Sequence, residues 1–154
     1  MKINILMVCL GNICRSPLAE GILKSKLDPN KYIVESCGTS SYHIGSKPDK
    51  RSIDIANKHG IDITDQRAAQ FTTSHFKKYD YIYAMDNSNY QNILKLASSD
   101  LEKNKVKLIL EELHPDSGLD VPDPYYGGAQ GFEDVYQMLN KACDLIVYNL
   151  ERSY

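Results

Sequence analysis

The sequence Cys9-Leu10-Gly11-Asn12-Ile13-Cys14-Arg15-Ser16-Pro17 joins an apolar run to a helical pattern. Residues 3–8 predict a short buried strand, and Pro17 suits the first turn of a helix, where its missing N–H costs nothing. Apolar residues then recur at helical spacing at Leu18, Ile22, Leu23 and Leu27. A strand, loop and helix in this order direct several backbone N–H groups and the positive end of the helix dipole at one point. The stretch therefore predicts an anion site with a thiol at its base.

The residue types within this loop suit nucleophilic attack on a phosphate. A thiol with an ordinary pKa of about 8.5 is mostly protonated at pH 7, but helix N-termini and neighbouring cations favour the reactive thiolate. Arg15 supplies a planar fork that binds two phosphate oxygens at once, and Ser16 supplies a hydroxyl for the sulfur. Gly11 permits a tight turn, and Asn12 tolerates left-handed backbone. The plain alternative is a buried structural cysteine beside a surface arginine, and the convergence of these residue types favours the catalytic interpretation.

The loop resembles the signature loop of the low-molecular-weight protein tyrosine phosphatases, down to the Ser-Pro pair that starts the helix. The resemblance implies an α/β fold in which a four-stranded parallel sheet is flanked by helices on both faces. It also implies a cysteinyl-phosphate intermediate, no metal or other cofactor, and an aspartate general acid in an Asp-Pro loop near the C-terminus.

A second motif lies on the predicted loop 114–131. Asp116, Asp120 and Asp123 are its candidate carboxyl groups, since cleavage of a phosphate ester through a thiolate needs an acid and later a base. In the run Asp123-Pro-Tyr-Tyr-Gly127, prolines stiffen the backbone on both sides of the carboxyl group and two tyrosines can flank an aromatic substrate. An Asp-Pro pair by itself is an ordinary turn element. The run matches the acid loop of the family, and the two motifs together carry the assignment.

Transferred residue by residue, the resemblance assigns a role to each position of the two motifs. It makes Cys9 the nucleophile, Arg15 the residue that binds phosphate and stabilises the transition state, and Asp123 first the acid and then the base. The expected phosphate cradle consists of the backbone N–H groups of Leu10, Gly11, Asn12, Ile13, Cys14 and Arg15. The expected supporting hydrogen-bond shell consists of Asn12, Ser16 and Ser36. The expected walls of the substrate cleft are Leu10, Ile13, Tyr42, Tyr125 and Tyr126.

The resemblance also implies roles for positions around this core. Cys14 is expected to form a reversible disulfide with Cys9 that prevents deeper oxidation, and no second cysteine pair or histidine cluster completes a zinc site. Asp86 matches a position of structural support. Many members have His after the mid-chain helix where this chain has Gln66, so one supporting contact to the loop is expected to differ.

The rest of the chain alternates between strand and helix patterns. Further strands are predicted at residues 32–36, 80–85 and 106–110. Helices are predicted at residues 16–27, 52–58, 74–78, 86–96 and 132–150. This alternation is typical of an α/β fold with a parallel sheet, whose ligands bind at the carboxyl ends of the strands. We expect residues 1–154 to form a single phosphatase domain, because this length suits one hydrophobic core.

The composition, with 42% hydrophobic and 25% charged residues, is ordinary for a soluble globular chain. The net charge of −2 argues against nucleic acid or an anionic membrane as a partner. No apolar stretch approaches a membrane span, and the N-terminal run lacks the cleavage site of a signal peptide. We therefore expect a cytoplasmic enzyme that acts on phosphotyrosine proteins or small aryl phosphates, with inorganic phosphate and similar oxyanions as competitive ligands.

Other functions built on phosphate binding fit the sequence less well. Arsenate reductases of the same fold carry two further cysteines in mid-chain, whereas no cysteine lies between Cys37 and Cys143. Protein arginine phosphatases carry Thr where this chain has Ile13 and lack the tyrosine pair. A phosphate-sensing module would lack the nucleophile or the acid, and both are present. A nucleotide-binding P-loop needs Gly-Lys-Ser/Thr, which does not occur in the sequence.

Overall fold

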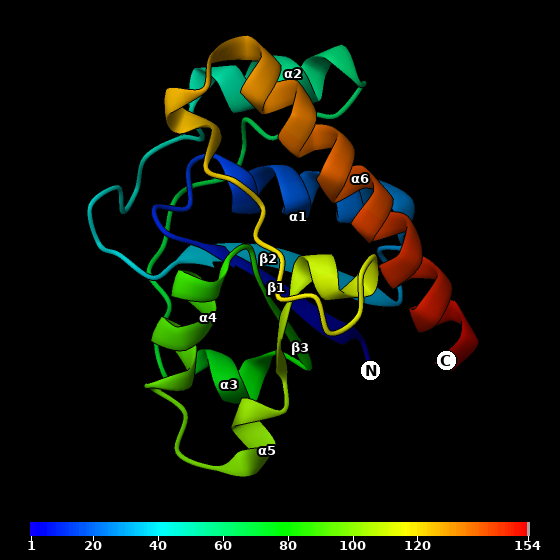
Figure 1. Ribbon diagram of the computed structural model, residues 1–154. Helices are drawn as coiled ribbons and strands as arrows, with labels where there is room; N and C mark the ends of the chain where they lie inside the picture. The colour runs from blue at the N-terminus through cyan, green and yellow to red at the C-terminus, as the bar shows by residue number, and fades with distance from the viewer. Residues whose placement is uncertain (154) are drawn as a thin grey trace.

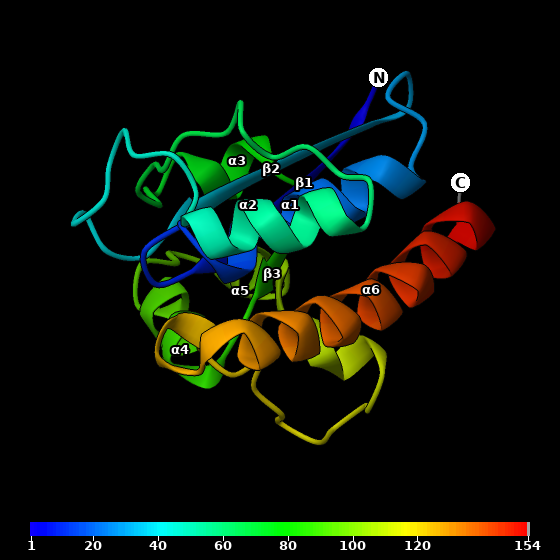
Figure 2. The same cartoon turned by 90° about the horizontal axis from the view of Figure 1, so that it is seen from above.

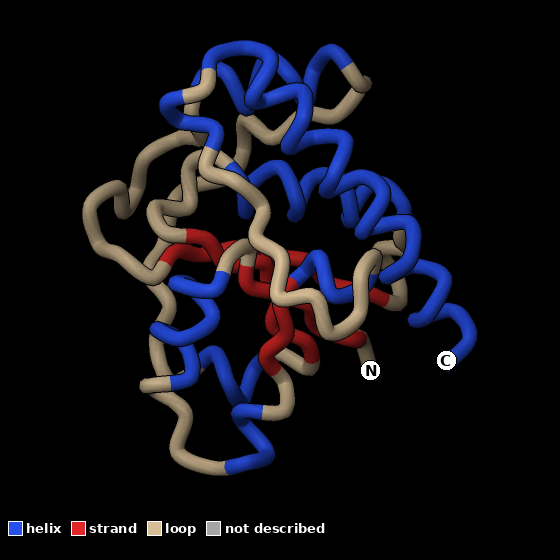
Figure 3. The backbone as a smooth tube through the Cα atoms, viewed as in Figure 1, coloured by secondary structure: helices blue, strands red, loops and turns tan. Residues whose placement is uncertain are grey.

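The computed structural model describes residues 1–153, apart from the side chain of Tyr126. A parallel four-stranded sheet with the strand order β2-β1-β3-β4 forms its centre. The strands are β1 at Ile3–Cys9, β2 at Tyr32–Gly38, β3 at Tyr81–Ala84 and β4 at Val106–Leu108. Figure 3 shows helices on both sides of these strands, which confirms the fold class predicted from the sequence.

Two layers of helices enclose the sheet (Figure 1). One layer contains α1 (Arg15–Lys26), α2 (Lys50–Lys58) and α6 (Gly128–Ser153). The other contains α3 (His75–Lys78), α4 (Asn87–Leu94) and α5 (Asp100–Lys103). Helix α6 packs on both α1 and α2, and the view from above in Figure 2 shows it running alongside them. None of the helices within residues 1–153 combines the length and apolar character that a membrane span needs.

Burial on both faces explains why β1 is continuously apolar from Ile5 to its end. Ile5 and Met7 face the layer of α1 and α6, whereas Leu6 and Val8 face the layer of α3 and α4. All four side chains are at most 1% exposed, so the strand lacks the alternation of a half-exposed sheet. The helical spacing predicted near the C-terminus is likewise confirmed by the buried positions Phe132, Val135, Tyr136, Leu139, Ala142, Cys143, Ile146 and Leu150.

The strand order reverses direction between β1 and β3. The chain leaves β1 through α1 and reaches β2 on one side, whereas β3 lies on the other side of β1 and leads through α4 and α5 to β4. In such sheets the crevice outside the carboxyl ends of the two central strands is the usual place for a ligand. Cys9 is the last residue of β1 and therefore lies at this crevice.

The predicted elements differ from the observed ones mainly around β4. The strand predicted over residues 106–110 is wrong at its end, because β4 stops at Leu108 and a 3₁₀ helix follows at Ile109–Glu112. Ile109 and Leu110 are buried with the layer of α1 and α6, and a short apolar run does not distinguish a strand from a buried helical turn. Helix α5, which has no counterpart in the prediction, is a single short turn.

Candidate active site

The Cys9 loop, residues 9–15, connects β1 to α1 at the carboxyl edge of the sheet. The sulfur of Cys9 accepts a hydrogen bond from the backbone N–H of Asn12 at 3.2 Å and lies 3.0 Å from the hydroxyl of Ser16. Asn12 has a φ of 57°, the left-handed conformation that this residue type tolerates. The sulfur is thus placed between a backbone N–H and a hydroxyl.

Hydrogen bonds behind the Cys9 loop determine which way the Ser16 hydroxyl points. Asn12 Oδ1 accepts from the N–H of Ala69 at 3.1 Å, which sets the orientation of the amide because a backbone N–H only donates. Asn12 Nδ2 then donates to Ser16 Oγ at 2.7 Å and to Ser36 Oγ at 3.0 Å. Ser16 Oγ therefore accepts from Asn12, and its own proton can go to the sulfur of Cys9 at 3.0 Å or to the more distant carbonyl oxygen of Cys37 at 3.4 Å.

This chain of hydrogen bonds ends at a buried carboxyl group, Glu20 on α1. Ser36 Oγ donates to Glu20 Oε1 at 2.7 Å, and Lys24 Nζ donates to Glu20 Oε2 at 3.0 Å. Burial raises the pKa of Glu20, and the contacts with Ser36 and Lys24 offset only part of the rise. Glu20 is not among the site residues predicted from the sequence, although an acidic residue among the apolar positions of a predicted helix is an available signal.

Gln66 supplies the contact that was expected to differ from many family members. Its Nε2 donates to the carbonyl oxygen of Pro17 at 3.0 Å, and its Oε1 lies 3.5 Å from Ser36 Oγ. The amide therefore touches both α1 and the group of side chains that supports the Cys9 loop.

Arg15 opens α1 and connects the Cys9 loop to the second half of the chain. Its side chain is only 4% exposed, and Nη1 donates to Asp86 Oδ2 at 2.7 Å and to the carbonyl oxygen of Val121 at 2.9 Å. Its Nη2 lies 4.0 Å from Asp123 Oδ2. Burial alone would lower the pKa of Arg15, but the negative groups of Cys9, Asp86 and Asp123 outweigh burial and raise it. The site therefore holds a permanent positive charge.

The Asp123 loop, residues 121–127, reaches the site from the segment before α6. Asp123 caps a 3₁₀ helix at Pro124–Tyr126, where its Oδ1 accepts from the N–H of Tyr125 at 3.0 Å. The start of the loop is anchored by Val121, whose N–H donates to the carbonyl oxygen of Met85 at 2.8 Å. The side chain of Asp123 is 44% exposed, so it can reach both a bound ligand and solvent.

The other two candidate carboxyl groups lie elsewhere. Asp120 Oδ1 accepts from the backbone N–H and the side-chain amide of Asn87, at 2.8 and 2.7 Å. Asp116 lies in a turn with a φ of 61°, and its N–H bonds to the carboxylate of Glu111. Neither Asp116 nor Asp120 lines the pocket of Cys9, and Asp123 is the candidate that does.

A pocket opens between the Cys9 loop and the Asp123 loop. Its lining consists of Cys9, Leu10, Gly11, Ile13, Cys14, Arg15, His43, Asp123 and Tyr125. Asn12 lies beneath this pocket, only 2% exposed, and directs its N–H to the sulfur rather than to a ligand. The expected contact by the Tyr126 side chain lies outside the described residues.

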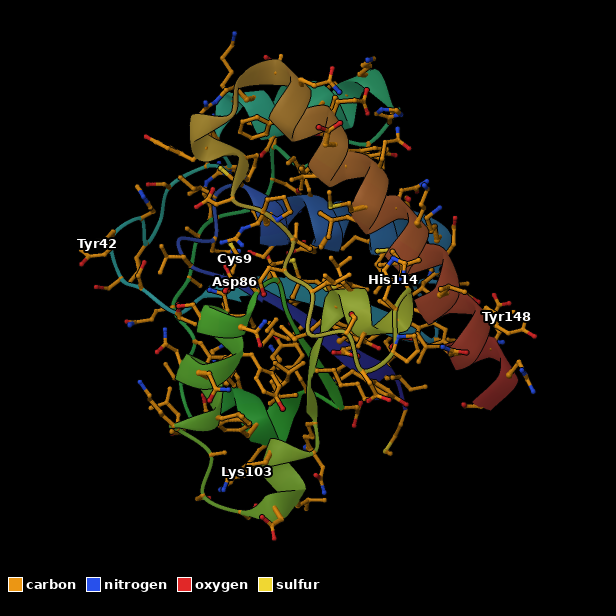
Figure 4. All side chains as sticks on the ribbon, in the orientation of Figure 1. Cys9, Tyr42, Asp86, Lys103, His114 and Tyr148 are labelled. Atoms are coloured by element: carbon orange, nitrogen blue, oxygen red, sulfur yellow. The ribbon has the colours of Figure 1, made fainter. Side chains whose placement is uncertain are left out.

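The prediction that Tyr42 forms a cleft wall is wrong. Its side chain is 85% exposed, and Figure 4 shows it at the outer edge of the molecule, away from Cys9. The neighbouring His43 lines the pocket instead, and its ring packs so closely over Gly11 that an added Cβ there would lie 2.9 Å from it. A turn closed by a 2.9 Å hydrogen bond from the N–H of Ser46 to the carbonyl oxygen of His43 leaves Tyr42 outside. Nothing in the sequence distinguishes which of two adjacent loop residues faces inward.

Cys14 lies at the N-terminal cap of α1 and is buried. Burial raises the pKa of its thiol to about 12, with further contributions from Asp49, Cys9 and Asp123. Cys14 is therefore a neutral thiol close to Cys9. Among the residues that the structure describes, no three or more His, Cys, Asp or Glu side chains form a group that could hold a metal ion.

Comparison with known proteins places this geometry in a family. The family model described as low molecular weight phosphotyrosine protein phosphatase matches residues 4–154. A protein of Synechocystis sp. described as a putative low molecular weight protein-tyrosine-phosphatase is 42% identical over 151 residues, which is 96% of each chain. A protein tyrosine phosphatase from Entamoeba histolytica, solved with Hepes in its active site, is 38% identical with a TM-score of 0.92, and 99% of each chain is covered.

A second solved structure shows the same fold with a phosphonate ligand. Vibrio vulnificus Wzb in complex with benzylphosphonate is 29% identical with a TM-score of 0.86, covering 97% of this chain and 99% of that one. The family match includes both the Cys9 loop and the Asp123 loop. We conclude that this chain belongs to the low molecular weight phosphotyrosine protein phosphatase family.

Proposed function

We propose that Cys9 attacks the phosphorus of a phosphotyrosine or aryl phosphate and that Asp123 serves first as the acid and then as the base. Family membership makes the chain a protein tyrosine phosphatase, a hydrolase, and the roles of its individual residues are the proposal. The observation that carries it is a single pocket lined by a cysteine sulfur with two donors, a buried arginine and an accessible carboxyl group.

In the first step, the Cys9 thiolate forms a bond to phosphorus as the bond from phosphorus to the aryl oxygen breaks. Asp123 gives its proton to that oxygen, so the phenol departs neutral. The N–H of Asn12 and the hydroxyl of Ser16 stabilise the thiolate before the attack. The product of this step is a cysteinyl phosphate and an ionised Asp123.

In the second step, water attacks the phosphorus of the cysteinyl phosphate while the Asp123 carboxylate accepts a proton from that water. The bond between sulfur and phosphorus breaks, which returns the thiolate and releases inorganic phosphate. One carboxyl group performs both transfers because the first step leaves it ready to accept a proton.

The phosphoryl oxygens are bound by Arg15 and by backbone N–H groups of the Cys9 loop. The loop precedes the N-terminus of α1, where unpaired N–H groups and the helix dipole favour an anion. Because Asn12 directs its N–H to the sulfur, we assign the cradle to Leu10, Gly11, Ile13, Cys14 and Arg15. Electrostatic stabilisation from these fixed groups acts on the charge that develops during transfer, and we propose that the reaction needs no metal ion.

Aryl esters suit the outer part of the pocket. Leu10 and Tyr125 line it and are 45% and 43% exposed, and Ile13 adds a further apolar wall. A substrate ring stacked on Tyr125 gains about 0.5–1.5 kcal/mol beyond its area burial, and the Vibrio relative holds benzylphosphonate, which carries an aryl group beside a phosphonate. We therefore propose phosphotyrosine proteins or small aryl phosphates as substrates, and inorganic phosphate as a competitive ligand.

We also propose that Cys14 protects Cys9 from irreversible oxidation. Hydrogen peroxide oxidises the Cys9 thiolate to a sulfenic acid, and condensation with the Cys14 thiol releases water and forms a disulfide that cellular thiols reduce. A thiolate nucleophile and four free cysteines suit a reducing compartment, so we propose a cytoplasmic location. The net charge of −2 supports the proposal that neither nucleic acid nor a membrane is a partner, and we treat residues 1–154 as one phosphatase domain.

The test is hydrolysis of an aryl phosphate in the presence of EDTA by the wild type and by Cys9→Ser. We expect metal-independent turnover by the wild type and a loss of about 10⁴-fold or more in the variant, because removing a nucleophile leaves only binding and electrostatics. Inorganic phosphate should still bind to the variant. Substantial turnover by Cys9→Ser would contradict the covalent route.

Peptides that carry phosphotyrosine, phosphoserine or phosphoarginine separate the substrate classes. We expect turnover of phosphotyrosine, because the aryl ester suits the pocket formed by Ile13, Leu10 and Tyr125. Activity on phosphoarginine alone would instead indicate an arginine phosphatase, although such enzymes carry Thr at the position of Ile13.

A further inference from the structure

Arg51, in the first turn of α2, binds two segments that are far apart in the chain. Its Nε and Nη2 donate to Oδ1 and Oδ2 of Asp49, both at 3.0 Å. Its Nη1 donates to the carbonyl oxygen of Tyr125 in the Asp123 loop at 2.7 Å. All three guanidinium nitrogens are therefore engaged, in the planar fork that only arginine offers.

Two aromatic rings hold the same guanidinium group. Its central carbon lies 4.9 Å from the centroid of the Tyr125 ring and 4.7 Å from that of Phe132, the first buried aromatic residue of α6. Cations at these distances from a ring are attracted to its face. Arg51 is thus fixed in position by contacts of two kinds, and it fixes Tyr125 in turn.

The other end of this connection reaches the Cys9 loop. The N–H of Asp49 donates to the carbonyl oxygen of Ile13 at 2.7 Å, and the hydroxyl of Ser52 donates to the carbonyl oxygen of Cys14 at 3.3 Å. The side chain of Asp49 also caps α2 by accepting from the N–H of Arg51 at 2.9 Å. The start of α2 therefore joins the Cys9 loop directly to the Asp123 loop.

The hydrogen bond from Arg51 to Tyr125 also bears on the position of the Asp123 carboxyl group, which the proposed mechanism uses. The N–H of Tyr125 donates to Asp123 Oδ1 at 3.0 Å, while its carbonyl oxygen accepts from Arg51. Two residues before Asp123, the carbonyl oxygen of Val121 accepts from Arg15. Asp123 thus lies midway between two backbone positions that are each held by an arginine, one from α1 and one from α2.

We propose that Arg51 is a positioning residue that holds the Asp123 carboxyl group at the correct distance from the leaving oxygen. The inference rests on the proposed role of Asp123 as the general acid. Arg15 secures the start of the Asp123 loop and also binds the substrate, whereas Arg51 secures the end of the loop and stays outside the reaction. Loss of Arg51 should therefore impair protonation of the leaving group and leave attack by Cys9 intact.

The experiment compares kcat/KM of Arg51→Gln and of the wild type over a series of aryl phosphates whose phenols span a range of pKa. We use kcat/KM because it reports the first chemical step and not hydrolysis of the intermediate. Esters of weakly acidic phenols need the acid, so we expect their kcat/KM to fall about tenfold. This loss is part of the acceleration that a general acid supplies. Esters of strongly acidic phenols should change little. An equal fall in kcat/KM for every ester would overturn the proposal. A smaller fraction of folded enzyme lowers all the values alike, whereas a misplaced acid does not.

Lys58→Gln is the matched control. Lys58 lies at the far end of α2 and pairs with Glu133 of α6 at 2.9 Å, so it also connects α2 to α6. The same substitution there should leave the dependence on the leaving group unchanged. If Lys58→Gln steepens this dependence as much as Arg51→Gln does, the effect belongs to the packing of α2 on α6 and the proposal is wrong.

Asp123→Asn separates failure of this inference from failure of the proposed mechanism. If Asp123→Asn leaves the dependence on the leaving group unchanged, Asp123 is not the acid and both proposals fail. If Asp123→Asn steepens the dependence and Arg51→Gln does not, only the role of Arg51 fails. In the double variant we expect Arg51→Gln to add little to Asp123→Asn, since both changes remove the same proton transfer.

Discussion

The Cys9 loop and the Asp123 loop meet in one pocket but are built in opposite ways. The polar and catalytic side chains of the Cys9 loop are buried, with Cys9, Asn12 and Arg15 at 2–3% exposure although Leu10 is 45% exposed, and side chains beneath the loop satisfy its polar groups. The Asp123 loop is at the surface, with the side chain of Asp123 44% exposed and Tyr125 43% exposed. Arginines from two other elements hold the Asp123 loop in place.

The difference follows from what each loop has to do. Groups that stabilise the charge of a transition state act best when they are fixed in advance, because no reorganisation is then needed during the reaction. A carboxyl group that serves a leaving group and afterwards a water molecule must instead stay accessible. Segments with many exposed backbone hydrogen bonds open more easily than a core, so the Asp123 loop depends on its contacts with Arg15, Arg51 and the carbonyl oxygen of Met85.

Arg15→Lys should have the largest effect, because Arg15 is part of the Cys9 loop and also contacts the Asp123 loop. A lysine keeps the charge, but its three donors are too few for Asp86, the carbonyl oxygen of Val121 and a bidentate contact with a phosphate. We expect kcat/KM for an aryl phosphate to fall by about 10³-fold, the scale known for arginines that stabilise phosphoryl transfer. Inhibition by inorganic phosphate should weaken in parallel.

Thermal unfolding of Arg15→Lys provides the control, since the variant must be folded at the assay temperature. If its kcat/KM stayed within about tenfold of the wild type, a point charge would suffice and the planar fork would not matter. In that case the Asp123 loop would need no contact from α1.

A pair of glycine substitutions tests the contrast between the loops directly. A Cβ at Gly38, the last residue of β2, would lie 2.6 Å from the carbonyl oxygen of Leu10 and 3.0 Å from the nitrogen of Asn12. Backbone hydrogen bonds on both sides of Gly38, to Ala69 and from Phe71, prevent the strand from yielding. We expect Gly38→Ala to shift the Cys9 loop, lower kcat/KM by about 10²-fold and reduce the melting temperature, since small misplacements of a reacting group have this scale of effect.

Gly127→Ala is the matched change in the Asp123 loop. A Cβ there would meet only Gly131 and Pro124, each at 3.6 Å, which is ordinary contact. We expect kcat/KM to remain of the same order as in the wild type. Equal losses in the two alanine variants would show that the Asp123 loop is as tightly constrained as the Cys9 loop.

The same contrast explains what the sequence predicts and what it does not. The Cys9 loop is local: strand, turn, cap and helix follow one another within residues 3–27, so each residue type reports on its neighbours. Asn12 adopts the left-handed conformation and Ser16 reaches the sulfur, as the sequence analysis expects. The central strands β1 and β3 are predicted well, because their apolar runs record burial on two faces, whereas the edge strand β4 has an exposed Lys107 and ends earlier than predicted.

Long-range contacts are where prediction from the sequence fails. Arg51 meets Tyr125 across 74 positions, and Glu20 meets Ser36 only after the sheet forms. Neither contact leaves a local pattern. A single turn in a surface loop determines that His43, and not Tyr42, lines the pocket. Interactions of this kind require the folded chain, and most of them support the Asp123 loop or the underside of the Cys9 loop.

The smallest effect is expected beneath the Cys9 loop, at Glu20. Burial raises the pKa of Glu20, so between the ordinary value of about 4.5 and the raised one the folded state binds more protons than the unfolded state. The stability that this group contributes is complete below the ordinary pKa and is lost as pH rises through the raised pKa. Glu20→Gln removes the titrating group, and the melting temperature should therefore decline less with rising pH in this window. The amide oxygen of Gln can still accept from Ser36, so turnover should change little.

Glu20→Leu is the companion variant, because it removes the acceptor as well as the charge. It leaves the hydroxyl of Ser36 without its partner in a buried position, which costs about 1–3 kcal/mol. We expect this variant to have a lower melting temperature than Glu20→Gln at every pH. We also expect inorganic phosphate to raise its melting temperature less. If both variants kept the pH dependence of the wild type, Glu20 would not titrate in this range. Glu20 would then support the underside of the Cys9 loop through its hydrogen bond with Ser36, whatever the charge of the carboxyl group.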